Sequence, residues 1–120
     1  MTRFEITILG CGSAMPTTLH NPSSQLVNVN EKLFMIDCGE GTQLQLRKYK
    51  TRINKLHSIF ISHLHGDHVF GLPGLLATLS LLGRTGDLNI YAHKDMELFL
   101  DPFIKYFGNQ FPYKINLVLL

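Results

Sequence analysis

The sequence predicts an α/β domain, and three observations support this class. Short β-rich apolar runs such as Phe4–Leu9 and Ile59–Ile61 are separated by segments with helical spacing. Polar residues and glycines crowd the ends of two runs, at Asp37–Gln43 and Ser62–His68, where α/β proteins place their functional sites. The leucines of 74–82 recur at intervals of three and four, which is typical of a helix packed on a core.

Length and composition indicate a single globular domain. The 120 residues are 45% hydrophobic, enough to bury a core, and the formal net charge is only +2. This mild basicity is compatible with nucleic-acid binding without being diagnostic of it. Cys11 and Cys38 form no C-x-x-C pair, so we expect free thiols. No segment is long enough for a membrane span, and Glu5 interrupts an N-terminal run too short for a signal peptide, so we expect a cytoplasmic protein without membrane contact.

Three strands are expected in the N-terminal third. Phe4–Leu9 forms the first strand, and the glycine-rich loop after it fails the dinucleotide-binding pattern because Met15 occupies the third glycine position. Beyond the turn-rich residues 21–24, Gln25–Val29 and Lys32–Ile36 are predicted to form a hairpin around Asn30-Glu31.

A helix is expected over Gln43–Tyr49, with Thr42 as its N-cap. Basic residues gather at its end and beyond: Arg47, Lys48, Lys50, Arg52 and Lys55. Two interpretations stay open at this point. The cluster either steers phosphate groups or is a solvated helix end that complements the helix dipole.

The second half continues the alternation of strands and helices. After the strand at 59–61, a helix is predicted over Gly74–Leu82, with Pro73 in its first turn. Its expected core face consists of Leu75, Leu76, Leu79 and Leu82. A strand at 88–92, a helix at 94–107 that Pro102 kinks or divides, and a strand at 115–120 follow. Because the sequence stops inside an apolar strand, we expect it to be the N-terminal part of a longer protein.

The segment Ser62–His68 is predicted to be a metal site. It places His63, His65, Asp67 and His68 within six consecutive positions, between two apolar segments. Imidazole nitrogen and carboxylate oxygen are the donors that Zn²⁺ and related metals accept. Gly66 is expected to let the backbone turn sharply, so that donors on both sides converge.

Several segments together resemble the metallo-β-lactamase superfamily and, within it, the ribonuclease Z family of tRNA 3′-end endonucleases. The superfamily motif is H-x-H-x-D-H at 63–68; the narrower resemblance rests on Gly10–Thr17, Asn21–Ser24, Asp37–Gln43 and Gly71–Leu76. It implies an αβ/βα sandwich of two mixed sheets between outer helices, of which 1–120 is the N-terminal portion of a single domain.

The resemblance also implies roles for individual residues. His63 and His65 would bind a first zinc ion, and Asp67 and His68 a second, with Asp67 also the catalytic proton acceptor. Asp37 would hold the loops from behind the ligands. The implied partner is a tRNA precursor, and the implied assembly is a homodimer.

The remaining ligands of the family, a histidine, an aspartate and a further histidine, have no match in this sequence. His20, His57 and His93 are not assigned as ligands. We therefore expect these 120 residues alone to be inactive, with a partial or empty zinc site. Two alternatives stay open: another superfamily hydrolase (arylsulfatase-like or a cyclic-nucleotide phosphodiesterase), or a non-catalytic metal-binding or interaction half.

Overall fold

The residues described by a computed structural model, 3–12 and 21–120, contain one mixed sheet of six strands. The strands are β1 (Phe4–Gly10), β2 (Ser24–Val29), β3 (Lys32–Ile36), β4 (Leu56–Phe60), β5 (Leu88–Ala92) and β6 (Ile115–Leu119). Their order across the sheet is their order along the chain. β1, β2 and β3 pair antiparallel, whereas β3 to β6 are parallel. The predicted α/β class is confirmed, and so is each of the predicted strands.

The β2–β3 connection is the predicted hairpin. Asn30 and Glu31 both have positive φ, 52° and 72°. Two consecutive positive φ values are typical of a type I′ turn, whose twist matches that of the paired strands. This turn aligns Gln25 with Ile36 and Val29 with Lys32.

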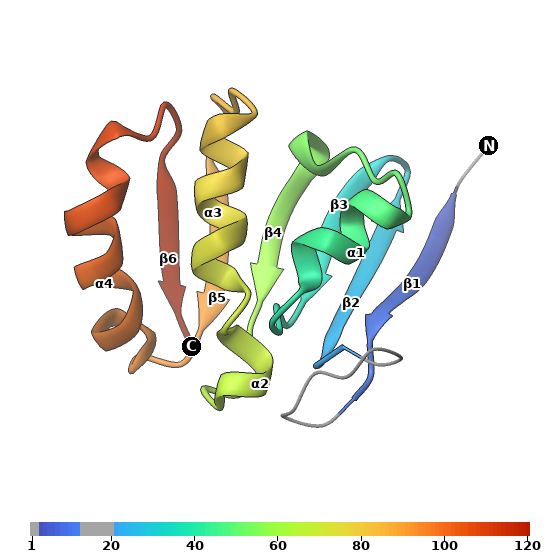
Figure 1. Ribbon diagram of the computed structural model, residues 1–120, viewed down its shortest axis with the longest axis horizontal. Helices are drawn as coiled ribbons and strands as arrows, with labels where there is room; N and C mark the ends of the chain where they lie inside the picture. Colours follow the sequence, from blue (N-terminus) through green and yellow to red (C-terminus); the bar gives the residue numbers. More distant parts are fainter. Residues whose placement is uncertain (1–2, 13–20) are drawn as a thin grey trace.

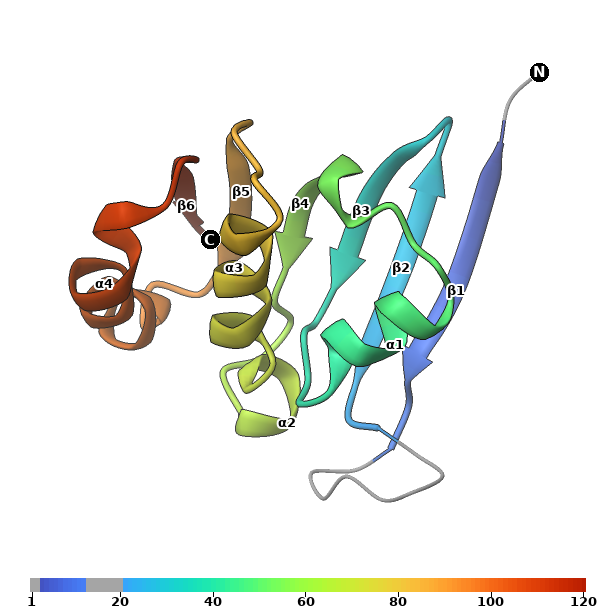
Figure 2. The same ribbon diagram turned by 45° about the horizontal axis from the view of Figure 1, so that its top comes forward.

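The helices are α1 (Thr42–Lys48), α2 (Gly66–Val69), α3 (Leu72–Leu81) and α4 (Met96–Phe107), with short 3₁₀ turns η1 (Ile53–Lys55) and η2 (Gly108–Gln110). Figures 1 and 2 show α1, α3 and α4 on the same face of the sheet. Each of these helices connects two neighbouring parallel strands. Such connections are right-handed, so successive connections that run in the same direction across the sheet place their helices on the same face. None of the described helices is long and apolar enough to cross a membrane.

The core lies between this helical layer and the sheet. Leu72, Leu75, Leu76 and Leu79 of α3 are fully buried. Leu82, predicted to share that face, is 47% exposed, so this prediction is wrong. The helix ends at Leu81, and the chain then turns away through Gly83, whose φ is +81°.

Two helix boundaries also differ from the prediction. Thr42 is the first helical residue rather than the N-cap: Gly41, at φ 86°, precedes the helix, and the Thr42 hydroxyl donates to the Gly39 carbonyl at 2.6 Å. Pro102 neither divides α4 nor starts a second helix, because one helix runs through it. The fully buried Met96 and Leu100 hold the first turns of this helix on the core.

The second face of the sheet is mostly apolar, and none of the described helices covers it (Figures 1 and 2). Residues paired across neighbouring strands share a face, so Phe4, Ile6 and Ile8 lie on the same side as the β2 residues with which they pair. The face continues across the sheet through Val27, Phe34, Ile36, Phe60, Tyr91 and Val118. Ile6 is 58% exposed. The second sheet that the resemblance implies is not among the described residues.

We predict that the 120-residue chain self-associates through this face, because contiguous apolar surface of this extent drives association. Light scattering coupled to size exclusion should show species larger than a monomer. The variant Ile6→Lys/Phe60→Lys should reduce their size. The control Leu81→Lys/Leu98→Lys, which changes exposed leucines of α3 and α4, should not. A monomeric wild-type chain would contradict this expectation.

Candidate metal centre

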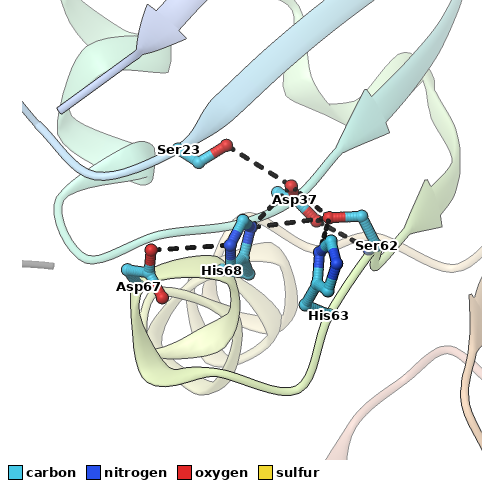
Figure 3. A network of polar contacts seen from close by, with 6 residues as sticks. All are labelled: Ser23, Asp37, Ser62, His63, Asp67 and His68. Carbon is cyan, nitrogen blue, oxygen red and sulfur yellow. Dashed lines mark hydrogen bonds and ion pairs between the residues drawn. The ribbon is translucent and has the colours of Figure 1, made fainter. Parts of the chain in front are cut away.

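The predicted ligands lie at the carboxyl ends of the central parallel strands β3 and β4. Asp37 follows β3 directly, and Ser62 to His65 form a loop between β4 and the short helix α2, which carries Asp67 and His68. Figure 3 shows how side chains from the two strand ends meet. Carboxyl ends of neighbouring parallel strands are the usual location of sites in α/β proteins.

The Asp37 carboxylate joins the two loops. It is only 3% exposed. It accepts hydrogen bonds from the Ser62 backbone N–H at 2.7 Å, from the Ser62 hydroxyl at 2.8 and 2.9 Å to its two oxygens, and from the Ser23 hydroxyl at 3.3 Å. His68 Nδ1 lies 2.8 Å from Asp37 Oδ2. Asp37 thus holds the loops together, as the resemblance implies for this position.

This carboxylate determines which ring nitrogen of His68 is available to bind a metal. An ionised carboxylate only accepts, so His68 Nδ1 donates to it, and in the neutral imidazole Nε2 then carries the lone pair that a metal would bind. Nε2 lies 3.4 Å from Asp67 Oδ2, so the two expected ligands of one metal face the same point. Ligand histidines in metal sites are commonly oriented by such an outer carboxylate.

The same carboxylate acts on His63 through Ser62. The Ser62 hydroxyl directs its hydrogen to Asp37, so its oxygen is left to accept from His63 Nδ1, 3.1 Å away. His63 Nε2 is then also free to bind a metal. The ring centroid of His63 lies 6.0 Å from that of His65 and 5.2 Å from that of His68. Ser62 has no predicted role, because nothing in the sequence distinguishes a bridging serine from a loop serine.

The donor types suit a metal, but the described residues do not complete a site. Within residues 3–12 and 21–120, no set of three or more His, Cys, Asp and Glu side chains is arranged to hold a metal ion. His93 and His57 lie elsewhere, as expected: His93 accepts a hydrogen bond from the Asp95 backbone, and the His57 ring lies 5.4 Å from that of Phe34. His20 and the loop residues 13–17 lie outside the described residues.

Backbone contacts lock α2 against the loop after β3. The Cys38 N–H donates to the His68 carbonyl at 2.7 Å, and the Gly71 N–H donates to the Cys38 carbonyl at 2.9 Å. The Cys38 side chain is fully buried, and burial raises the pKa of its thiol to about 12. A thiol that stays protonated packs as a small apolar group and is a poor metal ligand. Both cysteines are free, as predicted.

Glycines make this close packing possible. A Cβ at Gly71 would lie 2.0 Å from the Gly39 carbonyl oxygen, and one at Gly39 would lie 2.6 Å from the Asp67 carbonyl oxygen. The chain changes from extended at His65 to helical at Gly66, where α2 begins, and donors on both sides converge as predicted: the ring centroids of His63 and His68 lie 5.2 Å apart. A Cβ at Gly66 would meet the Phe70 ring at 2.3 Å, which gives this glycine a packing role.

Comparison with known proteins shows a family and a fold. The family model of the anti-Pycsar protein Apyc1 matches residues 4–101. A curated ribonuclease Z from Parabacteroides distasonis is 52% identical over 120 residues, which are 100% of this chain and 40% of that protein. The chain therefore spans about two-fifths of the length of this curated relative.

Solved structures agree with these matches. Human tRNase Z, short form (ELAC1), superposes with a TM-score of 0.86 at 35% identity, covering 93% of this chain and 42% of that one. The metallo-β-lactamase fold protein YhfI from Bacillus subtilis gives a TM-score of 0.72 at 25% identity, covering 94% and 44%. The mixed sheet and its helices thus have the metallo-β-lactamase fold, and the resemblance to ribonuclease Z is confirmed.

We predict that Gly71→Ala destabilises the protein, by about 1–3 kcal/mol or more, because the new Cβ overlaps a backbone oxygen that cannot move freely. Urea unfolding measures the change. The matched control is Gly86→Ala, where nothing lies within 4 Å of the added Cβ and φ is not positive. Equal stability of the two variants would show that the loops do not pack as closely as described.

We also predict that Asp37→Asn weakens Zn²⁺ binding by about 10–100-fold, as is usual when an outer-shell partner is lost. The amide of Asn would direct an N–H group at His68 Nδ1 or at Ser62, both of which donate to Asp37. Calorimetric titration of the full-length protein measures the affinity. Asp101→Asn, an exposed change on α4, is the control. An unchanged Zn²⁺ affinity in a folded Asp37→Asn protein would show that Asp37 does not orient the ligands.

Proposed function

We propose a function from one premise: this chain belongs to the family described by the Apyc1 model. The chain is part of a zinc-dependent endoribonuclease that removes 3′ trailers from tRNA precursors. The ribonuclease Z match along the whole chain supports this substrate. The observation that carries the proposal is that the Asp37 carboxylate orients His68 directly and His63 through the Ser62 hydroxyl.

His63 and His65 would hold one zinc ion, and Asp67 and His68 the other. His63 and His65 lie two positions apart in the loop after β4, and Asp67 and His68 are adjacent residues of α2. Zinc ions bound in such a pair of sites supply Lewis acidity toward phosphodiester oxygens and lower the pKa of bound water. The role of Asp37 and Ser62 is to orient the rings of His68 and His63 through their Nδ1 atoms, which leaves Nε2 of each neutral ring for the metal.

Asp67 is the proposed proton acceptor. Its side chain is 25% exposed, so one carboxylate oxygen can face His68 Nε2 while the site remains open to substrate. A carboxylate held at such a place can orient a water molecule and take up its proton. The remaining ligands would come from residues outside these 120, which form the N-terminal portion of a single metallo-β-lactamase-like domain.

Two further properties belong to this proposal. The full-length protein acts in the cytoplasm, in keeping with the free thiols of Cys11 and Cys38 in this chain. It forms a homodimer.

The test is cleavage by the full-length protein of a tRNA precursor with a 3′ trailer, beside hydrolysis of bis-p-nitrophenyl phosphate. We expect wild type to release the trailer, and Asp67→Asn to lower kcat by about 10²–10⁴-fold, the usual contribution of a general base. Asp101→Asn, exposed on α4, should retain full activity. Hydrolysis of the small diester with no trailer removal would instead identify another hydrolase of the superfamily.

A further inference from the structure

A polar groove lies near the amino end of β4, whereas the metal centre lies at its carboxyl end. Its volume is about 510 Å³, its floor includes Leu26 and Leu33 on the helical face of the sheet, and one wall is the segment Tyr49–Lys55. This segment follows α1 and leads into β4 at its amino end, whereas the metal loop leaves β4 at its carboxyl end (Figure 1). The five residues of β4 between them span roughly 16 Å at ~3.3 Å per residue.

The two walls of the groove differ in charge. On one side, Arg3 is held between Glu5 at 2.8 Å and Glu31 at 2.5 Å, so its charge is already compensated. On the other side stand Lys50, Arg52 and Lys55, which we call the basic wall. All three are exposed, and in the described part of the chain none of them forms an ion pair.

The excess of basic over acidic residues in the chain lies in the lining of the groove. Its lining holds four basic and two acidic residues. The chain has 11 basic and 9 acidic residues, so seven of each remain elsewhere. Residues 41–66 contain five basic residues and no acidic one.

The helix dipole explains only part of this basic cluster. Arg47 and Lys48 lie in the last turn of α1, where cations are favourable. Lys50, Arg52 and Lys55 lie beyond the helix end, and the dipole falls off within one turn. Lys50 also adopts a positive φ of 54°, a conformation that suits glycine better. The solvated-helix-end interpretation therefore does not cover the basic wall.

We propose that the basic wall binds the sugar–phosphate backbone of the RNA substrate at a distance from the scissile bond. This inference rests on the function proposed above. Three exposed cations spread over six residues, without a buried donor among them, suit a chain of phosphates more than a single enclosed anion. Contacts to an RNA backbone position the substrate without reading its sequence.

The test is the salt dependence of tRNA-precursor binding by the full-length protein, measured by fluorescence anisotropy. The variant is Lys50→Asn/Arg52→Gln/Lys55→Gln, in which Asn suits the positive φ of position 50. The control, Lys94→Gln/Lys105→Gln/Lys114→Gln, removes the same charge from exposed positions elsewhere. We expect the slope of log K against log salt to become shallower by about 2–3 only in the first variant, with affinity at low salt down about tenfold or more.

Hydrolysis of bis-p-nitrophenyl phosphate should be unchanged in both variants, because that substrate does not reach the groove. Equal slopes in the two variants would overturn the proposal, since they would reflect net charge alone. Binding unchanged from wild type in the first variant would overturn it as well. Binding is measured apart from cleavage, so the two proposals can fail separately. A wild-type protein that binds the precursor without cutting it would refute the proposed activity, and the salt slopes of the variants would still test the role of the groove.

Discussion

The Asp37 carboxylate is the group on which the metal centre depends. It lies almost fully buried at the end of β3 and accepts hydrogen bonds from Ser62 and His68. A buried carboxylate is unfavourable unless its oxygens are satisfied, so the metal loop is held where those donors converge. One residue thereby orients His63 through Ser62 and His68 directly, which ties an expected ligand of each metal to the same support.

Packing of the backbone reinforces this electrostatic constraint. The Cys38 peptide group bonds to α2 on one side and to Gly71 on the other, and Gly39 and Gly71 have no room for a Cβ. The position of the ligands is therefore set by main chain as much as by side chains. Loops held in this way lose little conformational entropy when a ligand binds, which favours affinity.

The α/β class, the strands and the site region were predictable because they depend on local pattern. Alternating apolar residues identified the strands, and the density of donors in 63–68 identified the site. The errors concern contacts made in three dimensions. Thr42 has the residue type of an N-cap, yet the chain turns one residue earlier at Gly41. Leu82 has core spacing, yet the helix ends before it. The bridge through Ser62 depends on the approach of two strand ends and has no sequence signal.

The order of the strands has a consequence for how the protein is made. Each strand pairs with its neighbour in sequence, from β1 to β6. The β2–β3 hairpin pairs residues close in sequence, such as Val29 and Lys32, and such contacts form quickly because little loop entropy is lost when they close. The parallel partners lie further apart, as Ile36 and Phe60 do, so they pair only after the crossover helix between them has been made. During synthesis on the ribosome, the sheet can therefore extend strand by strand as the chain emerges. Asp37, which follows β3, is therefore synthesised before the histidine loop whose Ser62 and His68 bond to it.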